Sequence, residues 1–339
     1  MKPTFKTTAL AILVSLGATA CLSNSDNSPA KPTPVQPQNS SDAPAITVAT
    51  PDGYNYEEAS KTSDGKNWRT VDLSNPVPAD NSSVSNERFG TTILTSDSLK
   101  GGGNLDLNKI SDNKLGFHEG TTTLNNNEIE YTVVNQPYSS YGIVTGQLEA
   151  PEMRAAETLG GKGVMAFYSG YSSDDINWFG VARSGKKKVT YQGDVIAIVT
   201  VDEGGYNVDE GHWNYTIKKF NNDGKVNITL DLSKLLNDEK EIDFSGEITS
   251  KVLDGKIQLN YDRMTYQDSR IKDGKAIYNS DIEGKFELGF YGKGGFSDIA
   301  GGATIYSNPK SPNGNGSLGR IDGKEILSYE AVFGGQLQP

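Results

Sequence analysis

Residues 287–306 have the sequence ELGFYGKGGFSDIAGGATIY, in which two groups of glycines stand on either side of a short apolar piece. A phosphate-binding loop needs its glycines between a strand and the start of a helix, so that backbone N–H groups face the anion. Here the strand-like ATIYSNP follows, and no Lys-Ser/Thr pair completes such a loop. The stretch therefore predicts a strand, a glycine-lined corner and a second strand, with glycine allowing neighbouring strands to approach closely.

The surrounding sequence consists of short runs in which apolar and polar residues alternate, a period typical of strands. These runs are NEIEYTVV (127–134), GVMAFYSG (163–170), KKVTYQGDVIAIVTV (187–201), HWNYTIKKF (212–220) and KVNITLDL (225–232). Four Asp-Gly pairs, in NNDGK (221–225), LDGK (253–256), KDGK (272–275) and IDGK (321–324), indicate hairpin turns. Only APEMRAAETLGG (150–161) and LSKLLNDEKE (232–241) resemble helices. An all-β chain is predicted, with one domain over 46–184 and a second, of hairpins that can close into a barrel, over 186–339.

Composition excludes several kinds of partner. The 339 residues carry a formal net charge of −11, whereas a sequence-independent nucleic-acid binder needs a surplus of Lys and Arg. A polybasic membrane patch is equally excluded. The chain has a single cysteine, so it contains no internal disulfide.

The first residues, MKPTFKTTALAILVSLGATAC (1–21), have two lysines, an apolar run and small residues, as secretory signals do. Small residues directly before Cys21 resemble a bacterial lipoprotein signal, which implies removal of 1–20 and lipidation of Cys21. The alternative is an ordinary signal peptide with an incidental cysteine. Residues 21–45 are rich in Ser, Asn and Pro and predict a disordered tether, so that a lipid would be the only membrane anchor.

Catalytic motifs are missing from the sequence. His118 and His212 are the two histidines, no G-x-S-x-G motif occurs, and the cysteine belongs to the signal. We therefore expect a protein that is not an enzyme, and no metal site, since the acidic loop VDEGGYNVDE (201–210) lacks EF-hand spacing. The alternative is a haem carrier, in which His118 or His212 ligates iron beside Trp213 and Tyr215. Otherwise both histidines are ordinary polar residues and the protein has no cofactor.

Aromatic residues in polar stretches are the better indication of a binding surface, because Tyr and Trp give large contact areas at low entropic cost. The candidates for contact with a partner are Tyr138, Tyr141, Tyr168, Tyr171, Trp178 and Phe179. Strand alternation would also send about half of such residues into the core. We expect the first domain to supply the main contacts and SNPKSPNGNGSLG (307–319) to contribute at the rim.

The glycine-rich stretch and the C-terminus together resemble a known family. The matching residues are Gly289, Phe290, Tyr291, Gly292, Ile299, Gly301, Gly302, Val332, Phe333 and Gly334. They are similar to the closing strands of the barrel in transferrin-binding-protein-type surface lipoproteins. This resemblance covers most of 186–339 and implies an N-terminal β-sandwich or handle domain followed by a C-terminal antiparallel eight-stranded β-barrel.

The family implies a location and a role. Its members are lipid-anchored in the outer membrane, at the cell surface of Gram-negative bacteria, and capture host proteins. A single lobe of this length is most similar to receptors for haemoglobin or haemoglobin–haptoglobin in Neisseria-type bacteria, which serve haem-iron acquisition beside a TonB-dependent outer-membrane receptor. Other members bind transferrin, complement factor H or free haem.

Overall fold

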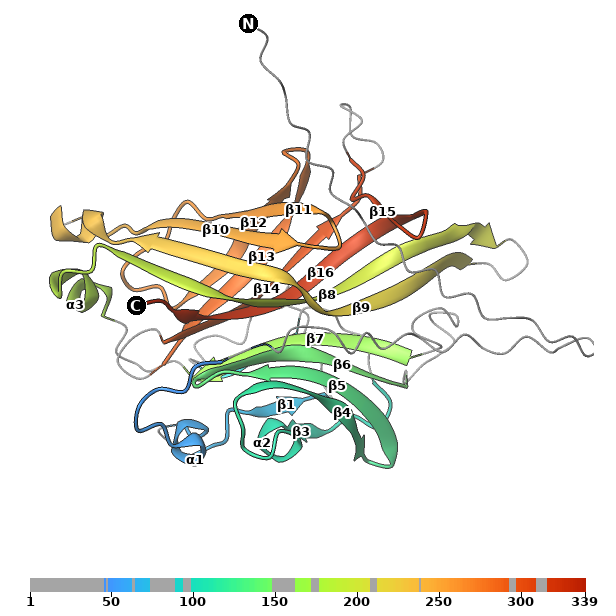
Figure 1. Cartoon of the computed structure of the whole chain (residues 1–339), viewed down its shortest axis with the longest axis horizontal. Coiled ribbons are helices and arrows are strands. Elements are labelled where there is room, and N and C mark those ends of the chain that lie inside the picture. Colours follow the sequence, from blue (N-terminus) through green and yellow to red (C-terminus); the bar gives the residue numbers. More distant parts are fainter. Residues whose placement is uncertain are drawn as a thin grey trace, which may run out of the picture. The chain divides into compact units, whose positions relative to one another are not determined.

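Eight antiparallel strands close into a barrel in the C-terminal half of the computed structural model (Figure 1). Their order is β8-β9-β10-β11-β12-β13-β14-β16, and β16 pairs with both β14 and β8. The strands are β8 (Lys188–Asn207), β9 (His212–Asp231), β10 (Asp243–Ser250), β11 (Gly255–Asn260), β12 (Arg270–Tyr278), β13 (Ile282–Tyr291), β14 (Asp298–Tyr306) and β16 (Lys324–Leu337). A short β15 (Arg320–Ile321) pairs with the start of β16. The expected eight-stranded antiparallel barrel is confirmed.

The structure describes residues 46, 48–62, 65–73, 89–93, 99–147, 162–171, 177–207, 212–237, 239–292, 297–308 and 316–339. The helix predicted over 150–161 lies outside them. The segment 232–241 contains the short 3₁₀ helix η2 (Ser233–Asn237). No helix among these residues is long and apolar enough to cross a membrane.

The glycine-rich stretch forms β13 and β14, the two strands that precede the closing strand. Gly301 shows why glycine is needed here, because a Cβ at this position would lie 2.2 Å from the carbonyl oxygen of Glu287 on the neighbouring strand. Gly292, which follows β13, has a φ of +131°, a conformation that other residues rarely adopt. The prediction of two strands in close approach is therefore confirmed.

Two of the four Asp-Gly pairs form hairpin turns and two do not. Asp254-Gly255 ends the turn between β10 and β11, and Asp322-Gly323 is the turn between β15 and β16. Asp223-Gly224 and Asp273-Gly274 instead lie at β-bulges inside β9 and β12. The prediction of a turn at these two places is wrong, because a bulge also uses Asp and Gly to accommodate unusual backbone angles. The runs 212–220 and 225–232 are consequently one strand.

Alternate side chains of the barrel strands fill its interior. At one end, α3 (Trp178–Arg183) and η2 contribute to this core. Trp178 is fully buried, and its ring meets that of Phe290 edge to face at 5.4 Å. The helix begins at Asn177, whose side chain accepts a hydrogen bond from the N–H of Gly180.

The N-terminal half contains a five-stranded antiparallel sheet of order β2-β7-β6-β5-β4 (Figure 1). Its strands are β2 (Phe89–Ile93), β4 (Gly116–Leu124), β5 (Asn127–Asn135), β6 (Ser139–Gln147) and β7 (Lys162–Tyr171). A second layer holds the paired β1 (Thr70–Asp72) and β3 (Asn104–Asp106) with the short helices α1 (Tyr56–Ala59) and α2 (Leu107–Ile110). Leu105 and Leu107 from this layer pack against Val133 and Phe167 of the sheet.

The opposite face of the sheet packs on the outside of the barrel. Tyr141 and Ile143 of β6 share a buried apolar cluster with Ile196 of β8, Ala300 of β14 and Val332 of β16. The sheet therefore has two apolar faces, as the inner layer of a sandwich does. The sheet and the barrel belong to one compact unit, Asp42–Pro339. We call the sheet with its second layer the handle.

Candidate functional site at one end of the barrel

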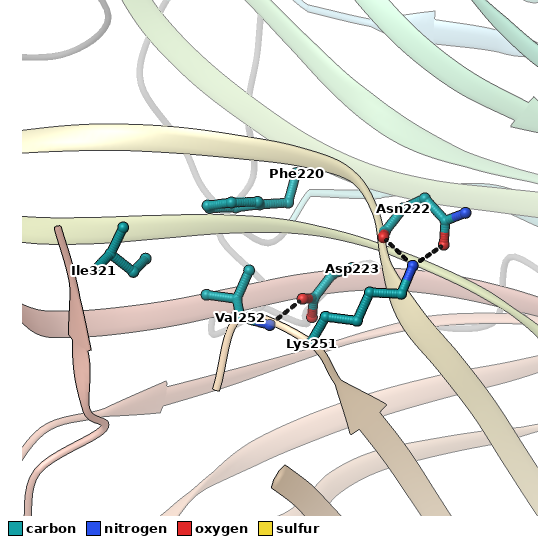
Figure 2. Close-up of a pocket in the computed structure, with 6 residues that line it drawn as sticks. All are labelled: Phe220, Asn222, Asp223, Lys251, Val252 and Ile321. Carbon is teal, nitrogen blue, oxygen red and sulfur yellow. Dashed lines mark hydrogen bonds between the residues drawn. The ribbon is translucent and has the colours of Figure 1, made fainter. Parts of the chain in front are cut away.

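A pocket of about 290 Å³ lies beside the turn between β10 and β11 (Figure 2). The bulge in β9 shapes one side of it, since Asn221, Asn222 and Asp223 stand where β8 has the single residue Ile196. The turn after β10 and the hairpin of β15 approach from the other sides. The pocket is lined by Phe220, Asn222, Asp223, Lys251, Val252 and Ile321.

Asp223 fixes the floor of the pocket. Its carboxylate is buried, with Oδ1 accepting a hydrogen bond from the N–H of Val252 at 2.8 Å and Oδ2 accepting one from the Tyr329 hydroxyl at 2.7 Å. The backbone carbonyl of Asp223 also accepts from the N–H of Lys251 at 2.8 Å. These bonds hold the bulge and the β10–β11 turn together, so the pocket is preformed.

The walls of the pocket are apolar and its rim is charged. Phe220, Val252 and Ile321 are half-buried and pack against the barrel core. Lys251 is exposed, and its Nζ donates to the backbone carbonyl and to the side-chain oxygen of Asn222, at 2.9 and 3.3 Å (Figure 2). Close by along β9, Lys218 pairs with Asp322 at 2.5 Å.

This arrangement suits the insertion of an apolar side chain. Among the described residues that line the pocket, the one carboxylate is already satisfied by two hydrogen bonds, and the others are Phe220, Asn222, Lys251, Val252 and Ile321. A preformed apolar pocket with a polar rim is what an anchor side chain of a partner protein occupies at an interface.

Apart from the pocket, a group of polar residues is buried where the handle meets the barrel. Arg69 is completely buried and donates hydrogen bonds to the carbonyls of Gln136 (2.6 Å) and Pro137 (3.0 Å) and to three hydroxyls. Those hydroxyls belong to Ser60, Ser140 and Tyr54. The guanidinium also lies 4.1 Å from the centre of the Trp68 ring and 4.6 Å from that of Tyr56. Arg69 thus fixes the β5–β6 turn from the handle side.

The same turn is bound to the barrel. Nε2 of Gln136 donates to the carbonyl of Ile299 at 2.9 Å, and the N–H of Tyr138 donates to Oδ2 of Asp298 at 2.5 Å. Burial raises the pKa of Asp298 to about 7, against the N–H groups of Tyr138 and Ser139 and the charge of Arg69, which lower it. Oδ1 of Asp298 has no hydrogen-bond partner among the described residues. The contact between the handle and the barrel therefore contains a carboxylate, that of Asp298, whose charge is poorly stabilised.

Three of the predicted contact residues are in the core. Tyr141 and Tyr168 are 1% exposed between the sheet and the barrel, and Trp178 is buried inside the barrel. Side chains with no accessible surface cannot touch a partner, so we remove these three from the candidate surface. Strand alternation explains the outcome, because each faces an apolar layer that the sequence does not identify.

The other three are half-buried. Tyr138 packs edge to face on Tyr54 at 6.2 Å, and Phe179 lies against Tyr266 at 4.8 Å. Tyr171 ends β7, and its N–H donates to the carbonyl of Tyr138. The structure does not bring these residues together with the pocket, and their contact with a partner stays a prediction.

The two histidines lie on different strands. His118 is on β4, with Nε2 3.0 Å from the carbonyl of Lys114, and burial lowers its pKa. Because a carbonyl only accepts, Nε2 carries the proton there and cannot ligate iron in this conformation. His212 begins β9 opposite Asn207, and its side chain lies outside the described residues, as do Cys21 and the loop 309–315. Among the described residues, no group of three or more His, Cys, Asp or Glu is placed to hold a metal ion.

Sequence reasoning missed the pocket. Its Asp-Gly pair indicated a turn, so the sequence did not predict a bulge that brings Phe220 beside Val252 and Ile321. The usable signal was the long alternating pattern on both sides of NNDGK, which is compatible with one continuous strand.

No protein-family model matches the chain, and no curated protein matches it significantly. Among solved structures it is similar to transferrin-binding protein B from serogroup B Neisseria meningitidis, with 16% identity and a TM-score of 0.41 over 75% of this chain and 44% of that one. It is also similar to HpuA from Kingella denitrificans in complex with human haemoglobin, with 16% identity and a TM-score of 0.30 over 60% and 55% of the two chains.

The apo form of the same haemoglobin receptor HpuA is 15% identical, with a TM-score of 0.31 over 62% of each chain. The chain thus spans about half the length of the solved structures that it matches, between 44% and 62%.

Proposed function

We propose that this chain is a lipoprotein of the outer-membrane surface that binds a host protein and catalyses no reaction. The proposed ligand is haemoglobin or haemoglobin–haptoglobin, and the proposed role is haem-iron acquisition with a TonB-dependent receptor. Cys21 would carry the lipid anchor. The end of the barrel that holds the pocket of Figure 2 would receive part of the ligand.

One observation carries this proposal: the residues that resemble the family meet in space although they are distant in sequence. Gly301 on β14 pairs with Leu288 on β13 and with Phe333 on β16, and Gly302 pairs with Val332. The matching residues are therefore the seam that closes the barrel. The position of these residues supports an architecture that is shared with the family. The proposed ligand is the one bound by the family members that have a single lobe.

The test is a binding comparison with a lipid-free form of the processed chain, which starts at residue 22 and retains every described residue. The chain is immobilised and exposed to haemoglobin, haemoglobin–haptoglobin, transferrin and factor H in parallel. We expect saturable binding of haemoglobin, alone or with haptoglobin. Retention of transferrin or factor H instead would contradict the choice of ligand, and retention of none would contradict the function.

Free haem is a separate arm of the same experiment. Haem titration with absorbance detection distinguishes a haem carrier from a haemoglobin binder, because an axial ligand gives a characteristic band. Variants His118→Ala and His212→Ala identify the ligand if such a band appears. We expect no band from Nε2 of His118, since the structure holds this atom on a carbonyl.

A further inference from the structure

The strand β4 forms an open edge of the handle sheet. It is the outermost strand in the order β2-β7-β6-β5-β4 (Figure 1). Its nine residues, GFHEGTTTL, pair with β5 in unbroken register from Gly116 with Asn135 to Leu124 with Asn127. Regular pairing along its whole length leaves the other side of β4 as a straight row of backbone groups.

The turn after β4 determines which backbone groups face outward. Asn125 and Asn126 have φ of 48° and 65°, as in a two-residue type I′ turn, and the flanking Leu124 and Asn127 form a hydrogen-bonded pair. Since hydrogen-bonded and non-bonded pairs alternate, the N–H and C=O groups of Glu119, Thr121 and Thr123 point away from β5. No hydrogen bond joins these groups to any other described residue.

Among the described residues, this edge lacks several of the devices that usually protect one. Natural edge strands are kept from pairing by charged side chains, above all lysine, by proline, a bulge or a very short length, or by a covering helix or loop. β4 contains no lysine and no proline, and its register with β5 shows no bulge. The residues at Glu119, Thr121 and Thr123 are exposed, and threonine favours the extended conformation. The edge is therefore ready to accept another strand.

Charge indicates which strand it would accept. Thr121 stands opposite Glu130 and Thr123 opposite Glu128, so these glutamates and Glu119 lie on one face of the β4–β5 pair. A strand added beside β4 would place every second side chain on this face, next to Glu119 and one strand away from Glu128 and Glu130. The carboxylate of Glu119 also accepts a hydrogen bond from Asn221 at 2.9 Å, and that of Glu130 accepts one from the Thr145 hydroxyl at 3.3 Å. A second copy of this chain would bring the same acidic face and a formal net charge of −11, which opposes self-pairing.

We propose that β4 binds an extended segment of a partner protein by strand addition, and that this segment carries lysine or arginine at alternate positions. The backbone groups of Glu119, Thr121 and Thr123 would supply the hydrogen bonds, and the glutamates would select basic side chains. This inference does not depend on which host protein, if any, occupies the barrel pocket.

The experiment uses the processed chain and a short fluorescein-labelled peptide in which lysine alternates with valine. Binding is followed by fluorescence anisotropy and by hydrogen exchange of the β4 amides. We expect the amides of Glu119, Thr121 and Thr123 to become protected only when the peptide is bound. Those of His118, Gly120 and Thr122 bond to β5 and should be protected throughout.

A matched pair of variants tests the backbone contact. Thr121→Pro removes an outward N–H while leaving the bonds to β5 intact, because proline is tolerated where the N–H faces solvent. We expect at least about tenfold weaker peptide binding, whereas Thr121→Val should bind like the unmodified chain. If Thr121→Pro fails to fold, a peptide N-methylated on alternate amides tests the same bonds on the unmodified chain. A peptide with glutamate in place of lysine should not bind.

Several results would overturn the proposal. One is equal affinity of folded Thr121→Pro and Thr121→Val, or of the methylated and unmethylated peptides. Another is an absence of binding at about 1 mM peptide, because the free energy of binding would then be weaker than about 4 kcal/mol. A dimer in sedimentation that Thr121→Pro abolishes would assign the edge to a second copy instead.

Discussion

The backbone N–H of Tyr138 in the handle donates to Oδ2 of Asp298 in the barrel at 2.5 Å, and Asp298 is completely buried. Gln136, two residues earlier, donates to the carbonyl of the adjacent Ile299. The β5–β6 turn is thus bound to the start of β14 by side chains from both partners. This pairing makes the stability of the handle–barrel contact dependent on one carboxyl group.

We expect Asp298→Asn to change how stability depends on pH. Burial raises the pKa of Asp298 from 3.8 to about 7, so the folded state binds the proton more tightly than the unfolded state does. Stability of the unmodified chain should therefore fall as pH rises from about 4 to about 7, by on the order of 1 kcal/mol per pH unit from this group. Asparagine cannot ionise and should lose this slope. Urea unfolding at several pH values measures the free energy of unfolding of both proteins. The same dependence of this free energy on pH in the two proteins would contradict the prediction.

Removal of the Arg69 side chain should strongly destabilise the handle. Arg69→Met leaves two buried carbonyls and three hydroxyls without the guanidinium donors that they now share. We expect a loss of about 3 kcal/mol or more in the free energy of unfolding, because buried acceptors are left unsatisfied. Arg69→Lys should lie between the two, since an ammonium has three donors. Equal stability of Arg69→Met and the unmodified chain would show that the network contributes little.

The close approach of the handle to the barrel can be tested at Gly334. A Cβ at this position would lie 2.3 Å from Cε1 of Tyr141, so Gly334→Ala forces the packed layers apart. We expect a cost of about 2 kcal/mol. In the double variant with Tyr141→Ala the ring is gone, and the two effects should be less than additive by about 1 kcal/mol. If the two changes in the free energy of unfolding were fully additive, Gly334→Ala would act through a contact other than the one with the Tyr141 ring.

Phe220 should be an anchor point if the barrel pocket receives the proposed ligand. Phe220→Ala removes one wall of the pocket, and loss of such a contact costs about 2 kcal/mol, or roughly thirtyfold in affinity. The control is Tyr306→Ala, on β14, which is 59% exposed and does not line the pocket. Affinity for haemoglobin is measured for both by biolayer interferometry. A loss of affinity in Tyr306→Ala alone would instead assign the contact to the outer wall of the barrel.

The proposed lipid anchor has a direct test at Cys21. In cells fed with a clickable fatty acid, the unmodified chain should be labelled and recovered with membranes. Cys21→Ser removes the thiol to which the lipid would be attached, and the variant should lose both properties. Labelling that survives in Cys21→Ser would contradict the lipoprotein signal.

Periodicity predicted the barrel well because its strands alternate regularly and because glycine marks the places where backbones nearly touch. Gly301 illustrates this, since no other residue fits beside the carbonyl of Glu287. The sequence did not distinguish turns from bulges at Asp223 and Asp273, because both conformations favour the same residues. It also could not tell that Tyr141 and Tyr168 face the barrel, because that apolar face appears only when two distant segments pack together.

The closing strand β16 is part of both the barrel and the surface that contacts the handle. Its inward side chains complete the barrel core, and Val332 on its outer side is part of the surface on which the handle rests. It pairs with β8, whose residues precede it by more than a hundred positions, as in Val332 with Ile196. Contacts this distant in sequence form late. The N-terminal half therefore has no completed surface to dock on until β16 has been synthesised and paired.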